Sequence, residues 1–255
     1  MGNALEITEL DWDSEQLGIQ CASLDLLHHQ TDVDECSLIK NITALLNDRC
    51  NLTFLTIKLP EHLLNTKTEV IKMGGMLVDT ELTFVATKNN TQQLNEVKTR
   101  SSETLNSKYS SEFCKQTKAT PFIELANEMK LSRFFNDENI GLAAATKLWQ
   151  CSIKNHCQGF ADELLVAYYE QMPAGLITMR ISEDNSIYLH IVGVLKKFQA
   201  KGIGKNMLAD IINRYGEHYS IYVETQSVNI NAQKLYKGAG FSLDNKKYIL
   251  HYWGK

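Results

Sequence analysis

The segment Gln199-Ala200-Lys201-Gly202-Ile203-Gly204 decides the fold class of this chain. It follows the β-rich stretch 187–194 and opens a stretch of helical periodicity, 203–215. The first N–H groups of a helix have no partner inside the helix, and the helix N-terminus carries partial positive charge. Glycines let a diphosphate approach that backbone closely, and Lys201 and Lys205 add charge at the rim. We therefore expect a pyrophosphate-binding loop between a strand and a helix.

Two other phosphate-binding loops do not fit this spacing. The dinucleotide fingerprint needs three glycines and an acidic residue about 20 positions further on. The phosphate loop of nucleoside triphosphatases needs a Gly-Lys-Ser/Thr run, which is missing here. A lone G-x-G is also compatible with an ordinary tight turn, so a second motif is needed.

That second motif is Thr225 to Phe241, TQSVNINAQKLYKGAGF. Its residues fall at N-x-x-A-x-x-L-Y-x-x-x-G-F, beginning at Asn229. Ala232 and Leu235 lie three apart and share a helix face that can pack on a sheet. Tyr236 points about a quarter-turn round, toward the edge of a cleft. Any amphipathic helix ending in Gly-Phe shows part of this pattern, so the pairing with the glycine loop carries the argument.

Together the two motifs resemble the GNAT acetyltransferases. The resemblance implies an α/β GNAT fold with a mixed twisted sheet and acetyl-CoA as cosubstrate, without a metal. It places the pantetheine between splayed strands at 187–194 and 220–224, with a main-chain N–H near Val194 polarising the thioester. It implies these cofactor-binding residues: Val192, Val194, Gln199, Ala200, Lys201, Gly202, Ile203, Gly204, Lys205, Asn229, Ala232 and Tyr236.

Acyl transfer to an amine needs a polarised carbonyl, a proton for the leaving thiolate and a neutral amine. Tyr236 matches the tyrosine that serves as general acid in the resembled family. His190 and Glu224 lie on the two strands expected to splay, and either is a candidate base, directly or through water. Strand alternation puts His190 on the face opposite Leu189, but does not say which face meets the cleft. A weakly basic amine needs only water.

The whole chain also resembles a narrower group, the bacterial TDP-fucosamine acetyltransferases. The resemblance rests on Leu10-Asp11-Trp12-Asp13 with Leu17-Gly18-Ile19, on Ser132-Arg133-Phe134 with Asp137, and on Thr225-Gln226. It implies that the acceptor is the 4-amine of a TDP-linked 4-amino-4,6-dideoxyhexose. The implied substrate-binding residues are Ser132, Arg133, Phe134 and Gln226.

The remaining chain suggests two domains. Strands are expected at 5–10, 18–27, 52–59 and 76–87, and helices at 33–46 and after Pro60 to 73. The stretch 88–111 is polar and has linker composition. We expect an N-terminal α/β domain at 1–88, a polar linker at 89–112 and a catalytic GNAT domain at 113–255. The helix–glycine–strand patterns at 61–79 and 229–244 echo one another, so the smaller N-terminal domain is expected to be a degenerate GNAT-like copy, unless the echo is a common pattern only.

Composition narrows the function classes further. The formal net charge is -4 and the pI is about 6.0, which argues against nucleic-acid binding. There is no apolar run of the roughly 20 residues that span a bilayer, and no signal peptide is expected, so we expect a cytoplasmic protein. The six cysteines follow no zinc spacing and are expected to be free thiols.

Two other functions remain open from the sequence. The first is a GNAT enzyme that acts on another small-molecule or protein amine. The second is a non-catalytic acyl-CoA sensor. An exposed last strand, 248–253, is expected to allow pairing across a homodimer.

Overall fold

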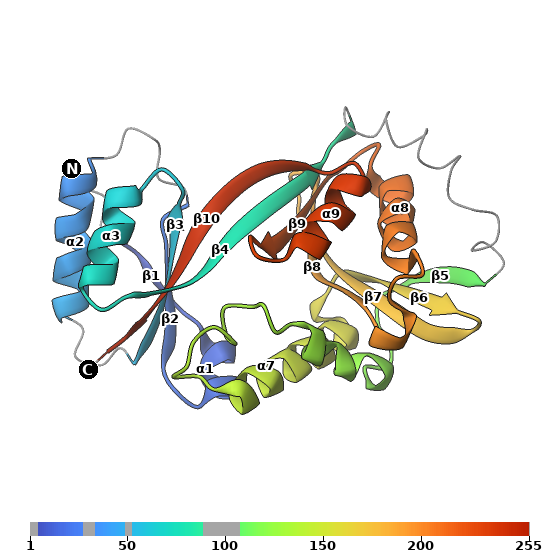
Figure 1. The fold of residues 1–255 in the computed structure, drawn as a ribbon, viewed down its shortest axis with the longest axis horizontal. Coiled ribbons are helices and arrows are strands. Elements are labelled where there is room, and N and C mark those ends of the chain that lie inside the picture. The colour runs from blue at the N-terminus through green and yellow to red at the C-terminus, as the bar shows by residue number, and fades with distance from the viewer. Residues whose placement is uncertain (1–4, 28–33, 49–52, 89–107, 255) are drawn as a thin grey trace.

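The computed structural model describes residues 5–27, 34–48, 53–88 and 108–254. In the described residues, ten strands form one mixed sheet in the order β1-β2-β3-β10-β4-β9-β8-β7-β6-β5 (Figure 1). The strands are β1 (Ile7–Glu9), β2 (Cys21–Asp25), β3 (Phe54–Pro60), β4 (Met76–Ala86), β5 (Tyr109–Cys114), β6 (Glu163–Tyr169), β7 (Met172–Ile181), β8 (Ser186–Val194), β9 (Ser220–Gln226) and β10 (Ser242–Trp253). The α/β class with a mixed sheet is therefore confirmed.

Helices cover the sheet at both ends. Figure 1 shows α2 and α3 beside the N-terminal strands, α8 and α9 beside the C-terminal strands, and α1 next to α7. The α-helices are α1 (Asp11–Leu17), α2 (Glu35–Asp48), α3 (Leu64–Lys72), α7 (Leu142–Asn155), α8 (Ile203–Tyr215) and α9 (Ile230–Gly238). Shorter turns are η1 (Thr120–Glu128), η2 (His156–Phe160) and η3 (Lys196–Phe198). In the described part of the chain, no helix is long and apolar enough to cross a membrane.

The two halves of the chain exchange their last strands. β10, which ends the C-terminal half, pairs antiparallel with β3 of the N-terminal half. β4, which ends the N-terminal strands, pairs antiparallel with β9 of the C-terminal half. β4 and β10 also pair with each other, and in Figure 1 they run side by side between the two ends of the molecule. Both strands follow a helix and a glycine turn, so the two segments that echo one another in the sequence occupy corresponding places in the sheet.

This exchange corrects the expectation of an exposed last strand. β10 lies between β3 and β4, so its backbone groups are paired on both sides from Lys247 to His251. A strand that is paired on both edges has no free backbone N–H and C=O groups that could pair with a second copy of the chain. The expectation of an exposed last strand is therefore wrong over 247–251, and the homodimer itself stays a prediction.

Two local expectations in the N-terminal half are also wrong. Pro60 ends β3, where it pairs with Lys247, and does not begin a helix, which starts only at Leu64. The segment that begins with Asp11 and Trp12 forms α1, a helix that the sequence did not predict. Trp12 packs against a small cluster that contains Phe134, so it links the N-terminus to the C-terminal half.

The domain boundaries, with a polar linker at 89–112, stay a prediction, although β5 (Tyr109–Cys114) overlaps the C-terminal end of that range. Residues 89–107 lie outside the described residues. Tyr109 begins β5, which pairs antiparallel with β6. The hydroxyls of Tyr109 and Ser111 donate to Asp210 Oδ2 at 2.6 and 2.7 Å, which ties this edge strand to α8.

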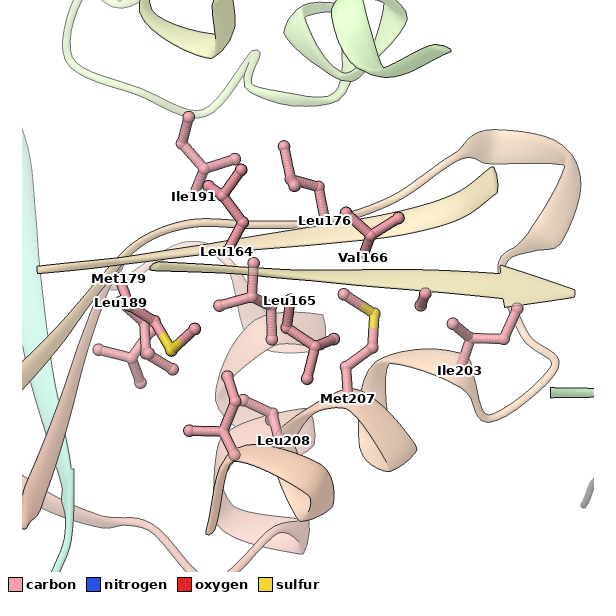
Figure 2. Close-up of a cluster of buried hydrophobic side chains, with 14 of the residues drawn as sticks. Leu164, Leu165, Val166, Leu176, Met179, Leu189, Ile191, Ile203, Met207 and Leu208 are labelled. Atoms are coloured by element: carbon pink, nitrogen blue, oxygen red, sulfur yellow. The ribbon is translucent and has the colours of Figure 1, made fainter. Parts of the chain in front are cut away.

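The main core lies on both faces of the C-terminal strands. Figure 2 shows Leu164 and Val166 on one face of β6 and Leu165 on the other, toward Met207 of α8. All four side chains are buried. A second core joins the N-terminal strands to α2 and α3, and β10 contributes Tyr248 and Leu250 to it. The C-terminal strand is thus part of the N-terminal core, so the exchange is held by packing as well as by hydrogen bonds.

Candidate active site

The glycine loop forms the start of α8, as the sequence predicted. Gly202 has a φ of 78°, in the left-handed region, and Ala200 has a φ of 60°. The side chain of Ile203 is only 1% exposed, so this residue offers a ligand its backbone alone. A Cβ on Gly204 would lie 3.3 Å from Leu235 Cδ2, which explains the need for glycine where α8 approaches α9. The residues present therefore fit a diphosphate at the helix N-terminus.

The side chains at the rim of this loop have separate partners. Gln199 Nε2 donates to the carbonyl of Val194 at 3.1 Å and to Glu128 Oε2 at 2.9 Å, so Gln199 holds the loop against β8. Lys201 is exposed, with its Nζ 5.4 Å from the centre of the Tyr169 ring. Lys205 lies in the first turn of α8 and is half-buried. The expected positive rim is therefore present around the helix start.

β8 and β9 separate where the pantetheine is expected. Among the described residues, their parallel ladder joins 186–189 to 220–223 and ends there. A cavity of about 90 Å³ opens beyond Leu189 and Val223. It is lined by Glu128, Met129, Leu131, Ser132, Trp149, Leu189, His190, Val192, Val223, Glu224, Thr225, Gln226, Asn229 and Tyr236.

His190 and Val192 of β8 line this cavity, whereas Ile191 between them is buried in the core. Leu189 is also buried, and it forms part of the cavity wall. His190 is also the extra residue of a bulge, because Thr178 pairs with Ile191 and Met179 with Leu189. A bulge re-aims the side chains around it. Val192 lines the cavity, and Val194 lies further along β8, opposite Gly175.

Tyr236 reaches the cavity from α9. Its side chain is 4% exposed, and its ring lies 5.9 Å from that of Phe84 and 6.0 Å from that of Phe241. Asn229 Oδ1 accepts from the backbone N–H of Ala232 at 3.2 Å, an N-cap that sets where α9 begins. Burial raises the pKa of Tyr236 well above its usual range, so the phenol stays protonated at neutral pH. Tyr236 is therefore placed to donate a proton.

A second cavity of about 230 Å³ adjoins the first and belongs to both halves of the chain. Its lining shares Ser132, Trp149, Leu189, His190, Val223, Glu224 and Gln226 with the first cavity. Its other lining residues are Asp79, Glu81, Arg133, Phe134, Tyr188 and Tyr222. Asp79 and Glu81 come from the exchanged strand β4. Sequence reasoning missed both, because nothing local indicates that β4 lies beside β9.

The predicted substrate-binding segment forms one wall of this second cavity. Ser132 Oγ accepts from Trp149 Nε1 at 2.8 Å. The guanidinium of Arg133 lies 4.4 Å from the centre of the Phe134 ring, and Phe134 itself is 6% exposed. Gln226 lines both cavities from the end of β9. The structure thus brings all four predicted substrate-binding residues to one cavity.

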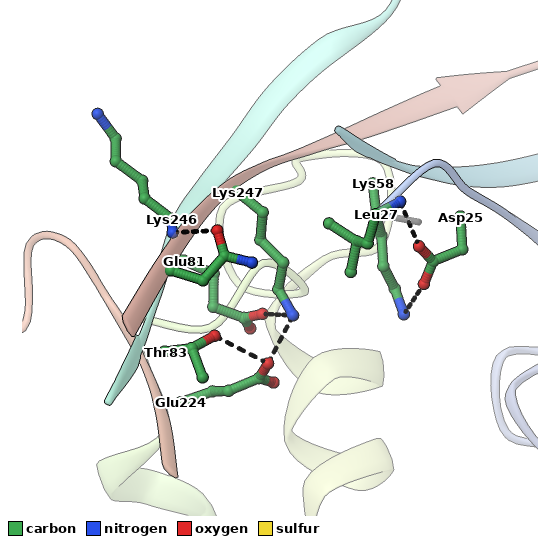
Figure 3. Close-up of polar contacts among 9 residues, drawn as sticks. Asp25, Leu27, Lys58, Glu81, Thr83, Glu224, Lys246 and Lys247 are labelled. Atoms are coloured by element: carbon green, nitrogen blue, oxygen red, sulfur yellow. Dashed lines mark hydrogen bonds and ion pairs between the residues drawn. The ribbon is translucent and has the colours of Figure 1, made fainter. Parts of the chain in front are cut away.

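Glu224, one of the two candidate bases, is held in an ion pair. Figure 3 shows the Lys247 ammonium between two carboxylates, at 2.7 Å from Glu81 Oε1 and 2.6 Å from Glu224 Oε1. Thr83 Oγ1 also donates to Glu224 Oε1 at 3.3 Å. Burial alone raises the pKa of Glu224, but the Lys247 charge outweighs it and the pKa lies below its usual range. Glu224 is therefore a weak base.

The Lys247→Met substitution should lower the free energy of unfolding by about 3–5 kcal/mol at pH 8, because it leaves two carboxylates without their cation. The loss should shrink at pH 5, since carboxylates whose pKa has risen take up protons there. Denaturant unfolding at both pH values measures this. Lys246→Met is the matched control, because that ion pair to Glu61 is 3.9 Å long and partly exposed, and it should cost about 1 kcal/mol or less. Equal losses for the two variants would contradict the prediction.

His190, the other candidate base, lines both cavities. Its ring centre lies 5.6 Å from that of buried His156. Partial burial lowers the pKa of His190 despite the nearby Glu224. Burial also lowers the pKa of His156, to about 4. Both imidazoles are therefore neutral at pH 7. In the described residues, no group of three or more His, Cys, Asp or Glu side chains is arranged to hold a metal ion.

Comparison with known proteins agrees with this geometry. Residues 123–241 match the acetyltransferase (GNAT) family, and the match ends one residue before β10. A stretch of 124 residues is 28% identical to the spore coat polysaccharide biosynthesis protein SpsD of Bacillus subtilis strain 168. That stretch covers 48% of this chain and 43% of SpsD, so the chain matches less than half the length of this curated relative.

Solved structures share the fold over the full length. A conserved protein of unknown function from Staphylococcus epidermidis has a TM-score of 0.62 at 16% identity, covering 100% of this chain and 93% of its own. A GCN5-related N-acetyltransferase from Sphaerobacter thermophilus has a TM-score of 0.58 at 9% identity, covering 99% and 77%. The fold, the glycine loop at the start of α8 and the two adjoining cavities are the features expected of an acyl-CoA-dependent N-acetyltransferase. Residues 123–241 therefore match the GNAT acetyltransferase family that the sequence motifs resemble, and the solved structures share the predicted fold.

Proposed function

We propose that this protein transfers an acetyl group from acetyl-CoA to the primary amine of a nucleotide-linked amino-dideoxy sugar. The observation that carries the proposal is the pair of joined cavities. One contains Tyr236 beyond the glycine loop, and the other is walled by Ser132, Arg133 and Gln226. The relative SpsD is named for polysaccharide biosynthesis, which supports a sugar acceptor.

The residues of the first cavity suit the donor side of the reaction. Acetyl-CoA supplies an activated thioester carbonyl. The start of α8 and Lys201 hold its diphosphate. Beyond Leu189, β8 pairs with β7 but no longer with β9, so its edge toward β9 offers backbone N–H groups to a polarised carbonyl oxygen. Tyr236 donates to the departing thiolate. Its ordinary pKa of about 10 already exceeds a thiol's of about 8.5, and burial widens that gap, so this transfer is uphill.

The residues of the second cavity suit an acceptor that carries both phosphate and amine. Arg133 provides a guanidinium for phosphate oxygens, a geometry that guanidinium groups match with two parallel hydrogen bonds. Gln226 and Ser132 provide neutral donors and acceptors for sugar hydroxyls. The carboxylates on β4 and β9 attract the amine end of the same molecule. Arg133 and the carboxylates therefore orient the acceptor with its amine toward Tyr236.

A second candidate function is acetylation of another small cationic amine. The observation in its favour is charge: Asp79, Glu81 and Glu224 line the second cavity, against Arg133 and the Lys247 ammonium beside it. A polyamine fits such a lining without any phosphate. A non-catalytic acyl-CoA sensor is the remaining alternative, and the placement of Tyr236 in the cavity argues against it.

A thiol-release assay separates these functions. Acetyl-CoA is combined with a panel of TDP-4-amino-4,6-dideoxyhexoses, spermidine and a lysine peptide. We expect rapid turnover of one TDP-sugar. Turnover with spermidine or the peptide alone would replace the sugar acceptor by the second candidate. Tight CoA binding without turnover of any amine would favour the sensor.

A further inference from the structure

Asp79 is a buried carboxylate that the exchanged strand β4 brings into the acceptor cavity. It is 8% exposed and lines the cavity together with Tyr188 and His190 of β8 and Gln226 of β9. The Gln226 side chain is close enough to lower the pKa of Asp79. Seven residues line both this cavity and the one that contains Tyr236. Asp79 and Tyr236 therefore lie in the walls of two adjoining cavities.

A β-bulge beside Asp79 fixes where its side chain points. On β4, Asp79 pairs with Ile249 and Leu77 with Leu250, so Val78 is the extra residue. Asn136 Nδ2 donates to the carbonyl of Val78 at 2.9 Å. This bond fastens the loop that carries Ser132 and Arg133 to the bulged strand, so the loop and Asp79 are positioned together.

Asp79 differs from the other two carboxylates of the cavity in its partners. Glu81 and Glu224 each contact the Lys247 ammonium within 2.7 Å. Among the described residues, Asp79 forms no salt bridge, and its partners are the neutral Gln226 amide and the Thr80 N–H. A carboxylate without a bound cation is the one that an incoming ammonium group meets.

We propose that Asp79 binds the acceptor ammonium and takes its proton, which makes it the general base supplied by the N-terminal half. This inference rests on the proposed function. One N–H bond of the ammonium breaks, its electron pair stays on nitrogen, and the proton forms a new O–H bond on the Asp79 carboxylate. The neutral amine then attacks the thioester carbonyl, the C–N bond forms and the C–S bond breaks. The thiolate takes the proton of Tyr236, and the second proton that the nitrogen loses restores the phenol. The proton on Asp79 leaves to solvent through the cavity opening.

The titratable groups that line the cavity with Asp79 come from several elements. They are Glu81 on β4, Arg133 in the 131–141 loop, Tyr188 and His190 on β8, and Tyr222 and Glu224 on β9, with Lys247 of β10 paired to the two glutamates. Burial and the Glu81 charge raise the pKa of Asp79 to about 7, against the opposing effect of Arg133. A general base works best when its pKa lies near the operating pH, because it then both accepts and releases a proton readily.

The test is the pH profile of kcat/KM in Asp79→Asn, measured by thiol release with the amine that the wild type turns over best. We expect a loss of about 100-fold or more at pH 7.5, and loss of the acid limb that the wild type shows near pH 7. A nucleophile that is mostly neutral at this pH, such as hydroxylamine, should lose far less, because it brings no proton that a base must remove before it attacks. Asp25→Asn is the control, since that exposed carboxylate lies on β2 outside both cavities and pairs with Lys58.

Thermal unfolding gives a second readout. A carboxyl whose pKa is raised in the folded protein binds its proton more tightly there, so stability is highest below about pH 4 and falls as pH rises through 7. Asp79→Asn removes that fall, so its melting temperature should exceed that of the wild type at pH 8.5 and match it at pH 4.5. If Asp79 were needed only for folding, the melting temperature of Asp79→Asn would lie below that of the wild type at pH 8.5.

Three outcomes would overturn the inference. An unchanged acid limb in Asp79→Asn, with wild-type kcat/KM, would remove Asp79 from the reaction. If the acid limb of the kcat/KM profile disappeared in a His190→Gln variant but stayed in Asp79→Asn, the base would be His190. Failure of the wild type to acetylate any amine would overturn the proposed function itself, and this inference with it.

Discussion

The Tyr236→Phe variant should lose about 100- to 10,000-fold in kcat while its KM for acetyl-CoA stays unchanged, since a proton donor acts in the transition state and not in ground-state binding. The aromatic contacts to Phe84 and Phe241 survive in the variant, so the buried ring keeps its packing. Steady-state kinetics with the best acceptor measure the loss. Because burial raises the pKa of Tyr236, the wild type should keep its proton donor through pH 9.

Tyr219→Phe is a matched control, because it removes a tyrosine hydroxyl elsewhere in the fold. It separates the effect of losing the Tyr236 hydroxyl from the effect of losing any tyrosine hydroxyl. Tyr219 packs edge-on against Tyr215, outside both cavities, so Tyr219→Phe should keep wild-type kcat. A Tyr236→Phe protein with wild-type kcat would rule out the general acid and leave the thiolate to be protonated by water. A rise in KM for acetyl-CoA with kcat intact would assign Tyr236 to cosubstrate binding.

Asp137→Ala should lower the free energy of unfolding by about 3–5 kcal/mol, a loss as large as that expected for Lys247→Met. Asp137 Oδ2 accepts from Trp253 Nε1 at 2.9 Å and lies 2.7 Å from His251 Nδ1, both on β10. Asp137 Oδ1 accepts from the Asn139 backbone N–H at 3.0 Å. Truncation leaves these donors buried without an acceptor and frees the 131–141 loop from the sheet. Denaturant unfolding at pH 7 measures the loss.

The same carboxylate gives a pH dependence of known sign. Burial alone raises the pKa of Asp137, but the bonds from His251 and Trp253 outweigh it and the pKa lies below its usual range. Its contribution is therefore present above about pH 4 and disappears as pH falls through the lowered pKa. The neighbour Glu138 is exposed, so Glu138→Ala should change stability by about 0.5 kcal/mol or less. Similar losses for both variants would show that Asp137 is not the fastening point.

The glycine loop before α8 and the helix α9 that carries Tyr236 were predictable because their sequence signals are local. Helical periodicity from 203 to 215 and glycines just before it predict α8, and the structure has α8 at Ile203–Tyr215. Asn229 as an N-cap and Gly240 after the last turn bracket α9 in the same way. Helix starts and ends depend on residues within a few positions of one another, so one sequence contains the information.

The exchanged strands and the acceptor cavity were decided by tertiary structure. Thr83 and Glu224 share a hydrogen bond across 141 positions of sequence, and nothing in the pattern of either strand names the other as its partner. The alternation of residues along β10 is compatible with an exposed edge strand and with an interior strand. Only the packing of both halves chose the interior place, and that choice brings Asp79 to the cavity that contains Gln226.

The sequence by itself thus determined the resemblance to the GNAT family and the places of the glycine loop and Tyr236 at the starts and faces of their helices. Each depends on a short run of residues whose chemistry is the same wherever the run lies. The acceptor side depends on side chains from four separate segments, near 79, 133, 190 and 226. Their meeting depends on the pairing of distant strands, whose free energy is gained only when the whole sheet has formed.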